Sequence, residues 1–286
     1  MASPIKRGMS PSQVSDWSPI NTDETPIAQS HFRAPFGLQL RQTIQSSGSV
    51  TIPAGINWVY VIMAGAGAGT FFNYGGNAGE VSWGWTLAQN TCIIGAGVSG
   101  APGGYTRYGH IIAKGGTTSS ATTFTNYYGI PGGAGFGDDN PQNGRPGSNA
   151  GNGGGAQLGV AQGGNGGDGI SGGAGGYGRA TTGTSTGGNG GSGLAGGGGG
   201  AGIGSTTGTR TGGNGGNGIG VDGTIYTGGT GASRTNADGF GGGGAGIAGN
   251  GSNGSTGNSG NGGLGGGGAG GGGTGTGGNG ILYIYY

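Results

Sequence analysis

Glycine supplies 90 of the 286 residues, whereas the four charged residue types together make up only 7%. Average proteins contain roughly 7% glycine and 25% charged residues, and the 30% of hydrophobic residues in this chain is too little for an ordinary core. The formal net charge is +1, without a basic run, and no stretch approaches the ~20 apolar residues of a membrane-spanning helix. We therefore expect neither nucleic-acid binding nor membrane insertion.

The glycine content also determines what could hold the chain together. Ordering one residue costs roughly 1–2 kcal/mol of backbone entropy, and few side chains are present to offset that cost by burial. Composition alone is therefore typical of disorder. An ordered structure would depend on backbone hydrogen bonds instead.

The first zone, residues 1–46, is poor in glycine and carries three prolines between Ser18 and Gln45. Ser10-Pro11-Ser12-Gln13 predicts a capped helix that ends near Trp17. The rest is typical of an extended attachment arm that lies on a partner. We expect deletion of residues 1–45 to leave the glycine domain folded and soluble but absent from assembled particles. The candidate assembly residues are the isolated apolar side chains Trp17, Phe32, Phe36 and Leu38.

The second zone, residues 47–131, predicts a small antiparallel β module. Residues alternate from Ile56 to Ala64, with Trp58, Tyr60 and Ile62 on one face and Val59, Val61 and Met63 on the other. The last six residues, 281–286, are typical of a strand that returns to pair in this module. Further strands are expected at Ser49–Pro53, Glu80–Leu87, Thr91–Ile94, Tyr105–Ala113 and Ala121–Tyr128.

The third zone, residues 132–280, contains an internal repeat. Copies that share the pattern Gly-Gly-Asn-Gly-Gly begin at Gly163, Gly187 and Gly212, and glycine recurs at every third position within each copy. A period of three fits neither an α-helix nor a strand, but it matches polyproline II geometry, which has no internal hydrogen bonds. The fold class that follows is mostly β and irregular, with the β module joined to a layered bundle of polyglycine II helices.

Such a bundle needs glycine wherever two helices touch, and it leaves one ridge free for side chains. We expect that outer ridge at Asn165, Asp168, Ser171, Ala174 and Tyr177. One larger apolar residue recurs in each copy, as Ile170, Leu194 and Ile219. We expect these residues to plug the end of the bundle or to meet the β module.

Two other glycine-rich architectures compete with this interpretation. Collagen requires abundant proline, whereas the chain has only 10, mostly outside the third zone. A calcium-binding β-roll is built from nonapeptides that Gly163–Ser171 matches, with Asp168 as the metal-binding acid. The equivalent positions are Ser192 and Asn217, which disfavours calcium.

The two ends of the glycine-rich part resemble a known group. Ser49-Val50-Thr51-Ile52-Pro53-Ala54-Gly55, followed by Val59-Tyr60-Val61 and Ala64-Gly65-Ala66-Gly67, looks like the opening of the glycine-rich domain of bacteriophage tail proteins. Residues 277–285 are similar to the close of that domain. The polyglycine sandwich also resembles the distal adhesins of T-even-type phages, which implies receptor recognition by loops between glycine helices. Residues 1–46 match no such pattern.

Two further families have similar glycine patterns. Mycobacterial PGRS proteins are similar through runs of the Gly-Gly-Asn-Gly-Gly type, but they carry a helical leader domain with no counterpart here. Glycine-rich antifreeze proteins look alike in their period, but they are small and disulfide-linked, whereas this chain has one cysteine, Cys92.

No catalytic or cofactor motif emerges from the sequence. His31 and His110 are the only histidines and fall in different zones, so a metal cluster or a histidine-based triad is not expected. Gly169-Ile170-Ser171-Gly172-Gly173 matches the nucleophile-elbow pattern by chance, since no strand–turn–helix context surrounds it. We expect no enzyme, no cofactor and no metal.

The leading hypothesis is a structural virion component of a bacteriophage, made in the host cytoplasm. It would be a minor tail or tail-fibre protein that joins other virion proteins through its arm and contacts a host cell-surface glycan or protein. Alternatives are a purely architectural head or tail-tip decoration protein, or a bacterial surface protein of the PGRS type. The candidate receptor contacts interrupt the glycine triplets: Arg179, Arg210, Tyr226 and Arg234.

Overall fold

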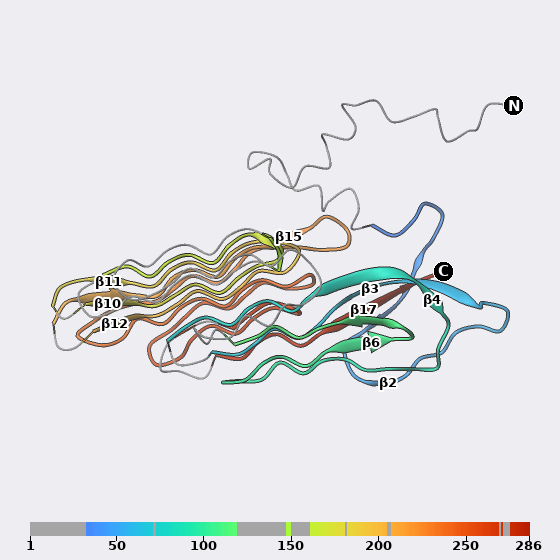
Figure 1. Ribbon diagram of the computed structural model, residues 1–286, viewed down its shortest axis with the longest axis horizontal. Coiled ribbons are helices and arrows are strands. Elements are labelled where there is room, and N and C mark those ends of the chain that lie inside the picture. The colour runs from blue at the N-terminus through green and yellow to red at the C-terminus, as the bar shows by residue number, and fades with distance from the viewer. Residues whose placement is uncertain are drawn as a thin grey trace, which may run out of the picture.

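The computed structural model describes residues 33–70, 73–118, 147–149, 161–180, 182–204, 207–268, 270 and 275–286. These residues form strands and irregular extended segments, and they contain no helix. The predicted class, mostly β and irregular, is confirmed. Figure 1 shows an elongated body, with a sheet at one end and long segments that run side by side away from it.

The described residues contain seventeen strands, and most of them are short. The strands at the sheet end are β1 (Leu40–Ile44), β2 (Gly48–Ser49), β3 (Trp58–Ala64), β4 (Val81–Leu87), β5 (Thr91–Cys92), β6 (Thr106–Tyr108), β7 (Ile111–Ala113) and β17 (Ile281–Tyr285). The glycine region contributes β8 (Gly147–Asn149), β9 (Gly169–Ser171), β10 (Gly178–Ala180), β11 (Ser185–Thr186), β12 (Gly202–Gly204), β13 (Thr209–Thr211), β14 (Gly218–Ile219), β15 (Ile225–Tyr226) and β16 (Ser233–Thr235).

The main sheet has four antiparallel strands in the order β1-β17-β3-β4. The C-terminal strand β17 lies between β1 and β3, with Tyr285 opposite Tyr60 and Ile281 opposite Ala64. The predicted return of residues 281–286 to the module is therefore confirmed. Chain segments more than 200 positions apart in sequence are joined in this one sheet.

Both faces of β3 are buried from Val59 to Ala64, which explains why β3 has large apolar residues at nearly every position. Val59, Val61 and Met63 pack with Leu282 and Ile284 beneath β5, β6 and β7. Tyr60 and Ile62 pack on the opposite face, toward the glycine region. The predicted alternation along β3 thus separates two cores.

Several expected elements differ from the structure. Only Gly48–Ser49 of the strand expected near Ser49–Pro53 pairs, and Tyr105–Ala113 is a hairpin of β6 and β7 rather than one strand. Leu40–Ile44, assigned to the arm, is the edge strand β1, because its backbone pairs with the distant strand β17. The helix expected at Ser10–Trp17, the strand at Ala121–Tyr128 and the candidates Trp17 and Phe32 lie outside the described residues.

The glycine region is held by backbone hydrogen bonds that repeat every third residue. Gly163, Gly166 and Gly169 donate to the carbonyls of Thr186, Asn189 and Ser192 at 2.9, 2.8 and 3.0 Å. The returning segment bonds antiparallel to the first, since Gly173 donates to Gly167 and Gly176 donates to Gly164. Successive residues of one segment therefore bond to different neighbours, which is a three-dimensional bundle rather than a flat sheet.

Segments that leave the sheet also enter this bundle. Gly67 donates to the Gly278 carbonyl at 2.9 Å, and Gly198 donates to the Gly76 carbonyl at 2.9 Å. Ala78 donates to the Gly172 carbonyl at 3.2 Å. The predicted division into residues 47–131 and 132–280 is therefore crossed by direct hydrogen bonds, because the connections β3–β4 and β5–β6 are themselves glycine-rich.

The bundle meets the sheet through its larger apolar residues. Leu194 and Ile247 are fully buried against the face that carries Tyr60 and Ile62, and Ile219 is 9% exposed there. Ile170 packs against the same cluster. These residues lie at chain reversals, so the expectation that one apolar residue per repeat meets the β module is confirmed.

Candidate functional site

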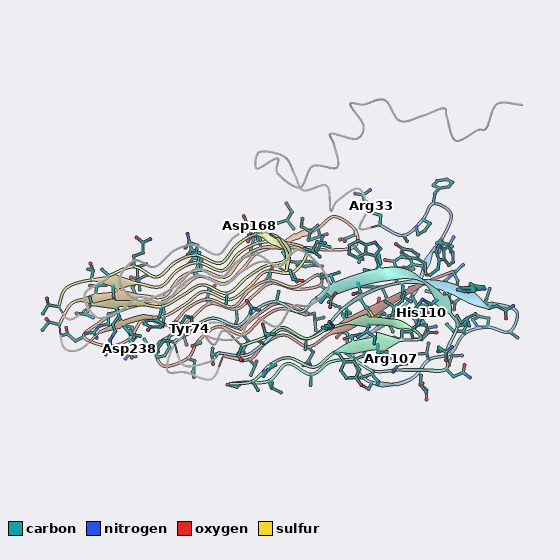
Figure 2. All side chains as sticks on the ribbon, viewed as in Figure 1. Arg33, Tyr74, Arg107, His110, Asp168 and Asp238 are labelled. Atoms are coloured by element: carbon teal, nitrogen blue, oxygen red, sulfur yellow. The ribbon has the colours of Figure 1, made fainter. Side chains whose placement is uncertain are left out.

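The end of the bundle farthest from the main sheet carries the best-formed polar surface. β10, β11 and β12 lie at this end in Figure 1, together with the label of Asp238 in Figure 2. β11, β13 and β16 form a three-stranded sheet there, with β11 parallel and β16 antiparallel to β13. We call this end the tip.

One face of the tip sheet is lined by hydroxyl groups. Thr186 lies opposite Thr211, which lies opposite Ser233, and Thr209 lies opposite Thr235. Residues that are directly opposite or two positions apart share a face. This hydroxyl face consists of Thr186, Thr209, Thr211, Ser233 and Thr235, and the exposed Thr184, two residues before Thr186, extends it.

The hydroxyl face is open to solvent and carries no charged side chain. Five of its residues are exposed and Thr211 is half-buried. The Thr211 and Ser233 hydroxyls lie 2.9 Å apart, in hydrogen-bond contact. Because strands are about 4.8 Å apart and alternate residues about 6.7 Å apart, the hydroxyls form a regular flat array.

The opposite face of the tip sheet is packed against the bundle. Ser185 is buried, and its hydroxyl donates to the Ile203 carbonyl at 2.9 Å. Arg210 is only 3% exposed, and its guanidinium lies over Gly204, where a Cβ would be 2.6 Å from Nε. These contacts fix the tip sheet from below and leave the hydroxyl face outward.

The candidate receptor contacts are only partly brought together. Arg179, Arg210 and Arg234 all lie on tip strands, but only Arg179 is exposed. Arg234 is half-buried with its guanidinium 5.6 Å above the centre of the Phe240 ring. The expectation that Arg210 is an exposed contact is wrong, because alternation along β13 turns its side chain inward while Thr209 and Thr211 face out.

Tyr226 lies at the other end of the bundle. It is in β15, opposite Gly218 of β14, and it interacts electrostatically with Tyr283 of the main sheet. Figure 1 places β15 near the main sheet and away from β10–β12. Tyr226 therefore does not join the three arginines, because residues 218–226 reverse direction at the sheet end of the bundle.

The sequence carries a signal for the hydroxyl face. Thr-Thr-Gly-Thr-x-Thr occurs at residues 181–186 and again at 206–211. Alternating threonines after a glycine predict a turn followed by a strand with one hydroxyl-bearing face. The arginines were more conspicuous because charged residues are rare in this region.

The outer surface along the bundle is a ladder of side-chain caps. Asn165 Oδ1 accepts from the Asn189 backbone N–H at 2.8 Å, and Asn189 Oδ1 accepts from the Asn214 N–H at 2.9 Å. In the next row, Asp168 Oδ1 accepts from Ser192 N–H at 2.7 Å, and the Ser192 hydroxyl accepts from Asn217 N–H at 3.0 Å. Outward-facing N–H groups that lack a backbone partner are thus capped by the neighbouring segment.

The ridge that carries Asn165 and Asp168 is buried farther along the chain. Ser171 and Ala174 are buried, although they were expected on the outer ridge. The Ser171 hydroxyl donates to the Gly79 carbonyl at 2.9 Å, and Asn77 Oδ1 accepts from the Ala174 N–H at 2.8 Å. The expectation was wrong for these two residues because the segment that follows β3 covers them.

The titratable side chains of the described residues are scattered rather than gathered into a metal-binding cluster. Among them, no group of three or more His, Cys, Asp or Glu side chains could hold a metal ion. The Thr86 hydroxyl lies 3.1 Å from His110 Nδ1, and burial raises the pKa of the Cys92 thiol.

The antiparallel bonding of consecutive segments around Ile170 differs from a β-roll, which is a parallel β-helix.

No helix among the described residues is long and apolar enough to cross a membrane. A scan against protein-family models and a search of curated proteins returned no match for this chain. Inference about function therefore depends on the chemistry of the surfaces.

Proposed function

We propose that this protein is a structural virion component of a bacteriophage, a minor tail or tail-fibre protein that acts in host-surface attachment. Its glycine region would be a bundle of polyglycine II helices that serves as a stiff spacer. Two features support the bundle: hydrogen-bond donors that recur every third residue, and successive donors that reach different neighbours.

The single observation that carries the attachment role is the hydroxyl face at the tip. A threonine hydroxyl both donates and accepts a hydrogen bond, and the adjacent methyl group offers a small apolar contact. An uncharged flat array of this kind suits the hydroxyls and C–H groups of a neutral cell-surface glycan. Exposed Arg179 beside it could add a charge-assisted hydrogen bond.

The shape of the molecule supports the same role. The main sheet, where residues 33–45 enter, lies at the opposite end from the tip. A protein anchored through its sheet end would therefore present the hydroxyl face away from its anchor. The glycine bundle between them contributes length without large side chains.

An architectural decoration protein without receptor binding is the second candidate. It is favoured by the burial of Arg210 and by the contact of Arg234 with Phe240, because arginines held inward contribute to stability rather than to recognition.

Two measurements test the proposal. Mass spectrometry of purified virions should detect the chain as a stoichiometric component, and its absence would contradict a virion role. Purified protein should bind host cells, and the triple variant Thr184→Val, Thr209→Val, Thr235→Val should bind at least tenfold more weakly. Each lost hydrogen bond is worth about 0.5–1.5 kcal/mol, so three should suffice for that loss.

A matched control is available on the side of the bundle. Thr227 and Thr230 are exposed, and their backbone N–H groups are capped by Asn250 and Asn253. The double variant Thr227→Val, Thr230→Val should therefore bind cells as the unchanged protein does. Equal binding by the tip variant and the control would leave the architectural role as the better description.

A further inference from the structure

The sheet end of the molecule carries a cluster of exposed large apolar side chains. Pairing in the main sheet aligns Leu40, Tyr285, Tyr60 and Trp85 in one row, and Trp58 with Leu87 in the next. Tyr60 and Tyr285 are buried, but Leu40, Trp58, Trp85 and Leu87 are between 46% and 55% exposed. The buried Tyr60 and Tyr285 separate Leu40 on β1 from the exposed patch of Trp58, Trp85 and Leu87 on β3 and β4. An exposed patch of large apolar side chains is typical of a protein-interaction site.

A turn beside this surface holds an aromatic side chain fully in solvent. The Leu38 N–H donates to the Pro35 carbonyl at 3.2 Å, and Gly37 supplies the positive φ of 90° that the turn requires. Ala34 and Leu38 on either side pack into the core with Tyr60. Phe36 between them is completely exposed, at 107%.

The anchoring of this turn makes Phe36 suited to a partner. A phenylalanine on a free loop would lose backbone conformational entropy when it binds a partner. The packing of Ala34 and Leu38 already restricts the backbone around Phe36, so that loss is smaller here. Buried aromatic anchors commonly dominate the energy of an interface. We call Phe36, Leu40, Trp58, Trp85 and Leu87 the docking surface.

The charges near the docking surface select the kind of partner. Arg33 and Arg41 are both exposed and bracket the turn and the start of β1. Arg41 is held in place, with Nε donating to the Tyr286 carbonyl at 3.3 Å and the guanidinium 5.8 Å from the centre of the Tyr286 ring. Asp222, which contributes to the raised pKa of Tyr285, is a carboxylate nearby, but the two arginines outnumber it. Pairing with the same surface of a second copy would bring the arginines together, whereas carboxylates on a different protein would complement them.

From these observations we infer that the docking surface binds another virion protein, through an apolar pocket for Phe36 that is rimmed by Asp or Glu side chains. The inference rests on the proposed virion role and adds the site and chemistry of assembly. It extends the contact from the arm to β3 and β4, which are distant in sequence. Arg33 is labelled in Figure 2 near the sheet end, so a partner bound there leaves the tip free.

Site-specific crosslinking tests where the partner binds. Full-length protein with Phe36→p-benzoylphenylalanine should be mixed with particles produced without this protein, illuminated and analysed by mass spectrometry. A crosslink to a different virion protein, at peptides that contain acidic residues, is the expected result. The inference would be overturned if crosslinks formed only between copies of this chain. It would also be overturned if incorporated chains formed no crosslink at all.

A control for this crosslink lies at the other end. Thr184→p-benzoylphenylalanine places the same group on the exposed hydroxyl face. It should give no crosslink to virion proteins, although the variant is incorporated normally. An equal virion crosslink from both positions would mean that the sheet end is not the docking site.

Incorporation measurements separate this inference from the proposed function. Phe36→Ser and the double variant Arg33→Glu, Arg41→Glu should each reduce incorporation at least tenfold, with thermal unfolding of Phe36→Ser unchanged because Phe36 makes no buried contact. If unchanged protein fails to enter the particles, the virion role fails and the inference fails with it. If the unchanged protein and Phe36→Ser enter the particles equally, the virion role stands and the inference about the docking surface is wrong.

Discussion

At the scale of single residues, the glycines are required by close backbone contact. A Cβ at Gly190 would lie 1.9 Å from the Gly197 carbonyl oxygen, which is far inside van der Waals distance. A backbone atom cannot turn aside as a flexible side chain can. The neighbouring segment would have to move, and its own hydrogen bonds would be lost.

We expect Gly190→Val to lower the free energy of unfolding by 3 kcal/mol or more, above the ~1–3 kcal/mol usual for overpacking. Gly249→Ala is the matched control, since its Cβ would meet nothing closer than 3.8 Å. Urea unfolding of both variants measures the difference. Similar midpoints would contradict the packing of the bundle.

The outer asparagines act through their side-chain oxygen. Asn189 Oδ1 accepts the Asn214 N–H, and the Ser192 hydroxyl does the same for Asn217 in the next row. Asn189→Ser should therefore be nearly neutral, whereas Asn189→Ala should cost about 0.5–1 kcal/mol, since water can replace part of the lost bond. Equal urea midpoints for the two variants would show that the cap does not stabilise the bundle.

At the scale of elements, the apolar residues at the chain reversals join the bundle to the main sheet. Leu194 is 1% exposed in the core that contains Tyr60, Ile247 and Tyr283. Leu194→Ala should cost about 2–5 kcal/mol because it leaves a cavity at that junction. Ile225→Ala, at a position that is 61% exposed, should change the unfolding midpoint little.

The tyrosines of the main sheet make its stability depend on alkaline pH. Burial, followed by the nearby Tyr60 and Asp222, raises the pKa of Tyr285 from 10.0 to about 12. Between these values the unfolded chain ionises while the folded chain holds its proton, so the unfolded state is favoured as pH rises. Burial also raises the pKa of Tyr60 and Tyr283.

We therefore expect the free energy of unfolding to fall steadily between pH 10 and 12, as measured by urea unfolding at fixed ionic strength. Tyr285→Phe should show a smaller fall, because one of the shifted groups is absent. If the free energy of unfolding of Tyr285→Phe falls as steeply with pH as that of the unchanged protein, the raised pKa of Tyr285 does not contribute to the fall.

At the scale of the whole molecule, the C-terminal part of the predicted arm, residues 33–46, belongs to the folded body. β1 pairs with β17, and Ala34 and Leu38 pack in the core that faces the bundle. The expectation that the glycine domain stays folded after deletion of residues 1–45 remains a prediction, and the structure adds a cost to that deletion. It removes the edge strand β1 and uncovers Tyr285.

Two truncations test this boundary. A chain that begins at Arg33 retains β1 and is the reference. A chain that begins at Ser46 should unfold at least 5 °C lower and bind a hydrophobic dye, since β17 becomes an edge with exposed aromatic residues. Identical unfolding of the two truncations would contradict a structural role for β1.

The sequence by itself determined the local backbone of this protein. Glycine at every third position between Gly163 and Gly178 predicts hydrogen bonds between segments, and alternation from Ile56 to Ala64 predicts a strand. That both faces of this strand are packed came from the structure. The recurring Leu194 and Ile219 also indicated where the bundle meets the module. Each of these features depends on spacing along the chain, which sequence displays directly.

The tertiary structure alone decided which side chains face water. Arg210 is buried while Thr209 and Thr211 form a surface, Ser171 is covered while Asp168 is exposed, and Tyr226 lies at the end opposite to Arg179. β1 became a strand only because β17 returned from the far end of the chain. These outcomes depend on neighbours that are remote in sequence, and a repeat that is nearly uniform in composition carries little information about which neighbours those are.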